Sequence, residues 1–166
     1  MEQKDTGLLL NQHNLKLQRF YFEQSVRLKG IRVICRVPKP GSKNYNGHGE
    51  LDEFFLDPKP VYCFFVEHPN QYTMKKMGWV AELNEDVSLI QVPYNTQGIQ
   101  RGTLFIVPSG IDNAQGRLFM VEDMSSIMIT PAYITCKIAP VYMSTFEPSQ
   151  LTHATSNFNL LNEEED

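Results

Sequence analysis

The sequence predicts a mainly β protein: a small antiparallel β-barrel or sandwich with an N-terminal helix, a long loop and an extended C-terminal tail. Several short apolar runs rich in β-branched and aromatic residues recur between residues 31 and 141, and glycine, proline and asparagine clusters separate them. No stretch between these runs has the length and period of a crossover helix. At 166 residues and 42% hydrophobic content, the chain can bury one core.

An N-terminal helix is expected within residues 8–29. The apolar residues Leu10, Leu17, Tyr21 and Leu28 are seven, four and seven positions apart, which is the spacing of one helical face. Gly30 predicts the end of the helix. The aromatic run 20–22 favours strand locally and is expected to lie in the core.

Seven segments alternate or run continuously in apolar residues and are expected to be strands: 31–37, 61–67, 79–83, 87–92, 103–107, 117–122 and 134–141. Residues 50–56 are consistent with a short strand or a turn. Trp79 is expected in the core. The three cysteines, Cys35, Cys63 and Cys136, are widely spaced and form no CxxC, so they are expected to be reduced and buried in strands.

The chain is expected to fold as a single β-rich domain over residues 1–147, followed by an acidic, flexible tail over residues 148–166. A long loop, 38–60, interrupts the domain; its first twelve residues hold two prolines, three glycines and two asparagines. The tail ends in four acidic residues. A solvated end is one interpretation of it. The other is docking onto a neighbouring subunit, with Phe158, Leu160 and Leu161 as the apolar anchor.

Charge is divided unevenly along the chain. The first 43 residues hold nine of the fifteen Lys and Arg against three acids, and the remaining 123 hold six against sixteen. A chain of this kind presents two different surfaces to its partners.

A basic stripe is expected on the strand at 31–37 and the loop after it. Arg32 and Arg36 share a strand face because side chains alternate, so both should be exposed and point the same way, with Lys39 and Lys43 extending that face. Such a stripe attracts phosphates without reading bases. A solvated basic face with no ligand is the alternative.

Catalytic chemistry has no clear signature here. No nucleophile elbow or phosphate-cradling glycine loop occurs, so we expect neither an enzyme nor a cofactor. His48, Glu50 and Asp52, with Glu53 nearby, offer imidazole and carboxylate ligands for a cation, yet their spacing matches no defined metal motif. We expect a polar surface loop and no metal site; a small enzyme that uses these residues with a metal is the alternative. The longest apolar runs are too short to span a bilayer. No signal peptide is expected at the N-terminus.

Three segments resemble a known family. Gly102 and Phe105 in the segment 101–107, followed by Gly116, Arg117, Phe119 and Val121 and a closing strand at 133–141, resemble the consecutive strands of head-closure, or neck, proteins of tailed bacteriophages. The order of features matches from about Leu17 to Val141. The 38–60 loop and the acidic tail are additions to the family's minimal pattern.

The resemblance implies a structural virion protein at the head–tail junction, assembled in the host cytoplasm. It implies a ring of copies around the DNA channel that connects the portal or adaptor protein to tail proteins. Double-stranded DNA would pass through non-specifically along Arg32, Arg36, Lys39 and Lys43. A tail terminator, a baseplate component or a stand-alone nucleic-acid-binding β-barrel remains an alternative.

Overall fold

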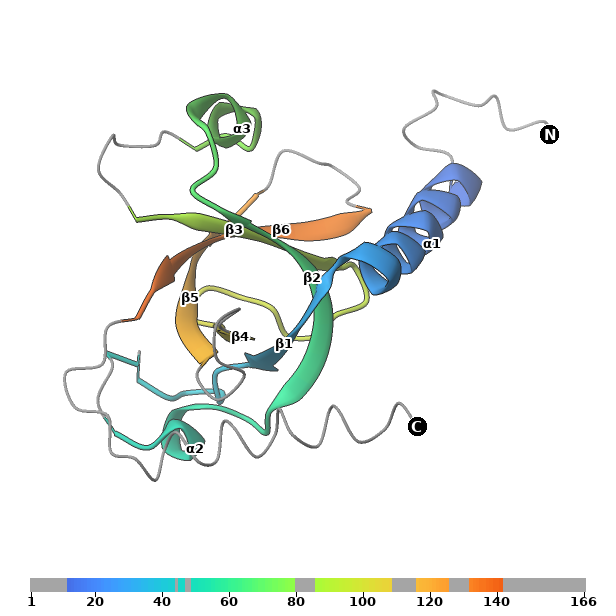
Figure 1. Cartoon of the computed structure of the whole chain (residues 1–166). Coiled ribbons are helices and arrows are strands. Elements are labelled where there is room, and N and C mark those ends of the chain that lie inside the picture. Colours follow the sequence, from blue (N-terminus) through green and yellow to red (C-terminus); the bar gives the residue numbers. More distant parts are fainter. Residues whose placement is uncertain are drawn as a thin grey trace.

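Six antiparallel strands close into a barrel in the computed structural model, which describes residues 12–43, 45–46, 49–79, 86–108, 116–125 and 132–141. The strand order is β1-β2-β3-β6-β5-β4, and Figure 1 looks down the barrel. The strands are β1 (Ile31–Arg36), β2 (Lys59–Glu67), β3 (Ser88–Pro93), β4 (Leu104–Pro108), β5 (Gly116–Met124) and β6 (Tyr133–Pro140). The helices are α1 (Gln12–Lys29), α2 (Leu51–Phe54) and α3 (Gln71–Lys76). The expected mainly-β class is confirmed, and pairing of β1 with β4 selects the barrel over the sandwich.

The barrel interior is filled by alternate side chains of every strand. Val33 and Cys35 of β1 point inward, because strand side chains alternate between two faces. The other buried members are Cys63, Ile90, Val92, Phe105, Val107, Phe119, Val121, Cys136 and Ile138. A small barrel packed in this way is a core and not a pore.

All three cysteines are free and buried, as expected. Burial raises the pKa of Cys35, Cys63 and Cys136 to about 12, because a thiolate would lose its hydration in the core. The thiols therefore stay neutral and act as small apolar side chains.

The described residues of the segment 38–56 (38–43, 45–46 and 49–56), which we call the covering segment, lie against the outside of the barrel. Leu56 N donates to Val37 O (2.8 Å) and Lys39 N donates to Phe54 O (2.9 Å), so the segment folds back on its own start. Its Tyr45 and Phe55 pack on outward-facing residues of β1, β4 and β5, namely Ile34, Leu104, Ile106 and Leu118. Residues 51–54 form helix α2, so the expected strand or turn at 50–56 is wrong. The loop that was expected over residues 38–60 ends two residues earlier, because β2 begins at Lys59.

Helix α3 covers the outside of the barrel at β3, across the barrel from α2 (Figure 1). Asn70 caps it, its side chain accepting from Thr73 N at 2.8 Å. Gly78, at φ 81°, follows its end. These two residues are the sequence signals by which the helix could have been predicted. Trp79 packs against Met74 and is buried as expected; it lies in no strand, and residues 80–83 of the expected strand are outside the described residues.

Helix α1 rests on β2 and β3 and then runs directly into β1 (Figure 1). Phe22 stacks on Tyr133, with ring centroids 4.5 Å apart, and Val26 is fully buried. At Gly30 the chain passes so close to Val26 O and Cys63 O that a Cβ would lie 2.4 and 2.5 Å from them. Only glycine fits this junction without a backbone shift.

The face of α1 that touches the barrel is not the face that the sequence spacing selected. Leu17, Tyr21 and Leu28 are exposed, and so is Phe20. The expectation that residues 20–22 all lie in the core is therefore wrong for two of the three. Phe22 and Val26 carry the contact instead, because the direction in which α1 enters β1 decides which side faces the sheet.

Candidate functional site

The predicted basic stripe is divided by the covering segment. Arg32 and Arg36 do share the outer face of β1, as expected. Arg36, however, is only 8% exposed and donates to Asp52 Oδ1 at 2.6 Å. The expectation that both guanidinium groups are exposed is wrong for Arg36, because α2 brings Asp52 over the end of β1. Arg32 is half-buried, with its guanidinium 5.6 Å from the centre of the Tyr62 ring.

Lys39 and Lys43 line a pocket of about 540 Å³ between the covering segment and the turn before β4. Lys39 Nζ donates to the backbone oxygen of Asp52 at 2.5 Å, which holds this ammonium against α2. Arg101 contributes a third cation from the opposite side. No Asp or Glu side chain is among the described residues that line this pocket, and of its three cations only Arg101 is paired with a carboxylate beside it, that of Asp123.

Tyr45 lines the same pocket and carries a buried polar group. Its side chain is 6% exposed, and its hydroxyl has no hydrogen-bond partner among the described residues. Burial raises the pKa of this phenol, so the hydroxyl stays protonated and available as a donor. Buried hydroxyls are nearly always hydrogen-bonded, and this one indicates a missing acceptor. Nothing in the local sequence distinguished Tyr45 as a site residue.

Arg101 is held by a tight turn. Gln100 N donates to Thr103 Oγ1 and Thr103 N donates to Gln100 O, both at 3.0 Å. Gly102 has φ 83°, a conformation that favours glycine. The turn therefore fixes the backbone position from which the Arg101 side chain extends. Gly102 was the one residue in the sequence that indicated this turn.

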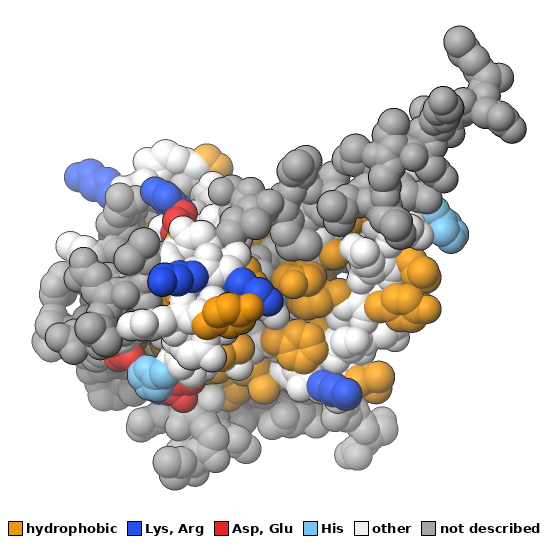
Figure 2. All heavy atoms as spheres, turned by 90° about the horizontal axis from the view of Figure 1, so that it is seen from above, with side chains coloured by type: hydrophobic (Ala, Val, Ile, Leu, Met, Phe, Trp, Pro, Cys, Tyr) orange, Lys and Arg blue, Asp and Glu red, His pale blue; other side chains and the backbone are white. Residues whose placement is uncertain are grey.

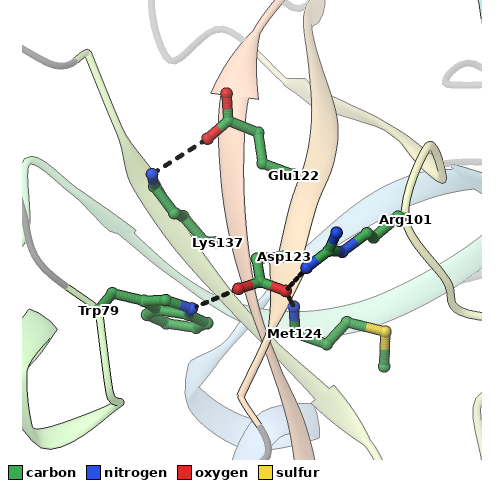
Figure 3. A network of polar contacts seen from close by, with 6 residues as sticks. All are labelled: Trp79, Arg101, Glu122, Asp123, Met124 and Lys137. Carbon is green, nitrogen blue, oxygen red and sulfur yellow. Dashed lines mark hydrogen bonds and ion pairs between the residues drawn. The ribbon is translucent and has the colours of Figure 1, made fainter.

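Asp123 anchors the Arg101 side of the pocket (Figure 3). Arg101 donates to its Oδ1 at 2.7 Å and Trp79 Nε1 donates to its Oδ2 at 3.0 Å. A β-bulge between Val121 and Asp123 makes this possible. Val121 points into the barrel, so regular alternation would point Asp123 inward too; the extra residue pairs it with Lys137 and turns it outward.

The Asp123 carboxylate should stabilise the fold in a pH-dependent way. Hydrogen bonds from Arg101 and Trp79 lower the pKa of Asp123 below its usual value of about 3.9. A carboxylate with a lowered pKa stabilises the fold above its unfolded pKa, and this contribution is lost as pH falls through the folded pKa. The urea concentration at the midpoint of unfolding should decrease as the pH falls below about 4, and Asp123→Asn should make this decrease smaller. Arg101→Gln should also make this decrease smaller. If both variants show the same decrease below about pH 4 as the parent protein, this account is contradicted.

An apolar surface lies on the outer side of α1. Leu17, Phe20, Tyr21 and Leu28, which we call the α1 face, are 41%, 55%, 59% and 82% exposed. Figure 2 shows apolar side chains gathered along the side of the molecule that carries α1. Contiguous apolar patches of this kind mark protein contacts more often than isolated exposed residues do.

The remaining predicted site residues give no structural result. His48 lies outside the described residues, as do Phe158, Leu160, Leu161 and the whole tail 148–166. Among the described residues, no group of three His, Cys, Asp or Glu side chains is arranged to hold a metal ion. In the described part of the chain, no helix has the length and apolarity needed to cross a membrane.

Comparison with known proteins gives no family for this chain. No family model matches it, and no curated protein matches it. Its function is therefore inferred from its own sequence pattern and geometry.

Proposed function

We propose that this protein is a structural component of a bacteriophage virion at the head–tail junction, where copies form a ring around the DNA channel. The ring would connect the portal or adaptor protein to tail proteins. One support is the resemblance to neck proteins described above. Its two most specific segments are neighbours in the barrel, where Phe105 of β4 pairs with Phe119 of β5.

The observation that carries the proposal is the α1 face beside a closed barrel. Because every strand has two hydrogen-bonded neighbours, copies cannot associate by adding strands to a free sheet edge. Association must use side-chain surfaces, and the α1 face offers four large apolar side chains for it. A ring needs this surface to meet a different surface on the next copy, because cyclic assemblies beyond the dimer use heterologous contacts.

The DNA channel of such a ring would lie between copies. The interior of each barrel is packed with side chains and leaves no passage. Of the four predicted channel residues, Arg36 is held by Asp52, whereas Arg32, Lys39 and Lys43 keep a charge that is not engaged by that ion pair. A small number of non-specific cations fits a surface along which DNA must slide.

The proposal is tested by removing the α1 face without touching the core. The double variant Leu17→Ser/Tyr21→Ser should fold normally, because both side chains are exposed, yet lose assembly by about tenfold or more. Light scattering would measure the mass of the protein alone and after mixing with virion particles stripped of tails. Tyr72→Ser on α3, which removes a ring that is 68% exposed elsewhere, is the matched control.

Two outcomes would contradict the proposal. One is a double variant that assembles on the particles as well as the parent protein. The other is a parent protein that stays monomeric, does not bind to the particles and binds duplex DNA in a salt-sensitive manner. That second result would favour a stand-alone nucleic-acid-binding barrel.

A further inference from the structure

We propose that the cationic pocket beside the covering segment binds the acidic run Glu163–Asp166 of this chain. The pocket collects Lys39, Lys43 and Arg101 from two separate parts of the fold. Arg101 is paired with Asp123 outside the lining, whereas the described lining holds no Asp or Glu for the two lysines. The run provides four consecutive carboxylates. Opposite charges gathered in this way on two parts of one chain favour contact between them.

The buried hydroxyl of Tyr45 requires an acceptor, and a carboxylate is the strongest acceptor the chain can offer. Tyr45 lines the pocket, and its hydroxyl oxygen is shielded from solvent with no partner among the described residues. A carboxylate oxygen placed there would accept from the hydroxyl while its charge faces the ammonium groups. The contact would thus satisfy the hydroxyl and the cations together.

The last described residue lies beside this pocket. The last described residue, Val141, donates its N–H to Leu118 O and packs on the apolar cluster that includes Tyr45 and Phe55. Twenty-one residues separate Val141 from Glu163. Such a length spans up to roughly 70 Å when extended, which is long enough for the run to reach the pocket of its own copy.

A flexible acidic peptide fits this pocket better than duplex DNA does. Tyr45 lines a hollow whose described lining also includes Phe54 and Phe55. Phosphates of a duplex stand on a stiff convex backbone and contact cations that protrude from a surface. A glutamate side chain can enter the hollow instead. In this assignment Lys39 and Lys43 serve the acidic run, and Arg32 remains as the predicted DNA contact.

Zero-length crosslinking of the intact chain tests the contact directly. A carbodiimide joins an amine to a touching carboxylate as an amide, with loss of water, and mass spectrometry identifies the pair. Lys43 and Lys39 should crosslink to residues 163–166, whereas the exposed Lys75 on α3 should not. Mixing isotope-labelled and unlabelled chains separates contacts within a copy from contacts between copies, so the result does not depend on ring formation. Equal crosslinking of Lys75 and Lys43, or none at Lys43, would overturn the proposal.

A binding assay tests the role of Tyr45. The acceptor is the full chain carrying E163Q, E164Q, E165Q and D166N, and the probe is a labelled peptide of residues 157–166. Tyr45→Phe should raise the dissociation constant about tenfold, because one hydrogen bond to a charged group is lost, and Lys75→Gln should not change it. Equal melting temperatures would show that all variants fold. Equal binding by the parent and Tyr45→Phe chains would sink the proposal, as would a short DNA duplex that responds to Tyr45→Phe when the peptide does not.

Discussion

Replacing Trp79 by alanine is expected to destabilise the protein by about 3–5 kcal/mol. Trp79 is 8% exposed and packs with Met74, Val87 and Leu89, which together attach α3 to the outside of β3. Truncation would open a cavity that the surrounding strand cannot fill by collapsing. It would also remove the Nε1–H donor to Asp123 Oδ2. Urea unfolding followed by far-ultraviolet circular dichroism measures the loss.

The control for this prediction separates packing from hydrogen bonding. Trp79→Phe keeps an aromatic ring in the cluster and loses the donor, so it should cost about 1–2 kcal/mol. A loss near zero for Trp79→Ala would show that the indole does not hold α3 on the barrel. In that case Met74 and Leu89 would be sufficient to hold α3 on the barrel.

Replacing Arg36 by glutamate is expected to cost about 3–5 kcal/mol, as when a buried charge loses its partner. The Arg36 side chain is 10% exposed, whereas the Asp52 side chain is 82% exposed. Glutamate would therefore place a carboxylate in a nearly dry position beside a second carboxylate. Denaturant unfolding at neutral pH measures the effect.

Two further variants show where this cost arises. Arg36→Met keeps the packing of the long side chain and should lose only about 1 kcal/mol, because no charge remains buried. Asp52→Asn changes a mostly exposed partner and should cost under about 1 kcal/mol. If Arg36→Glu folds as stably as the parent protein, the guanidinium does not occupy this site beneath α2.

The predicted DNA contact is best tested at Arg32 alone. A double variant of Arg32 and Arg36 would confuse loss of DNA contact with loss of folding, because Arg36 is part of the fold. Arg32→Gln alone leaves the Arg36–Asp52 pair intact and tests the channel role of a half-buried cation.

The strands could be predicted because their signal is local. Val33 and Cys35 alternate with Arg32 and Ile34, and that period of two survives folding unchanged. The position of helix α1 in the chain was predicted, but the side of the helix that faces the barrel was not. The spacing of Leu17, Tyr21 and Leu28 is helical, yet the side of the helix that meets the barrel depends on the junction at Gly30 and on the position of Phe22 against Tyr133.

The site was only half predictable for a related reason. The charges of Arg32, Arg36, Lys39 and Lys43 are plain in the sequence, but their exposure depends on a segment that folds back over β1. Arg101, Tyr45 and Asp123 come from distant positions, and only barrel closure brings the turn before β4 beside the covering segment. The bulge at Asp123 follows from pairing with β6, which residues 117–124 alone do not specify.

The mainly β class, the reduced and buried cysteines and most of the strand positions could be predicted from the sequence, because burial period and turn residues are short-range properties. Long-range contacts are what close the sheet into a barrel, bury Arg36 under α2, and bring Lys39, Lys43 and Arg101 to one pocket with Tyr45. These features arise from contacts between residues far apart in the chain, whose relative positions are fixed only when the whole barrel forms.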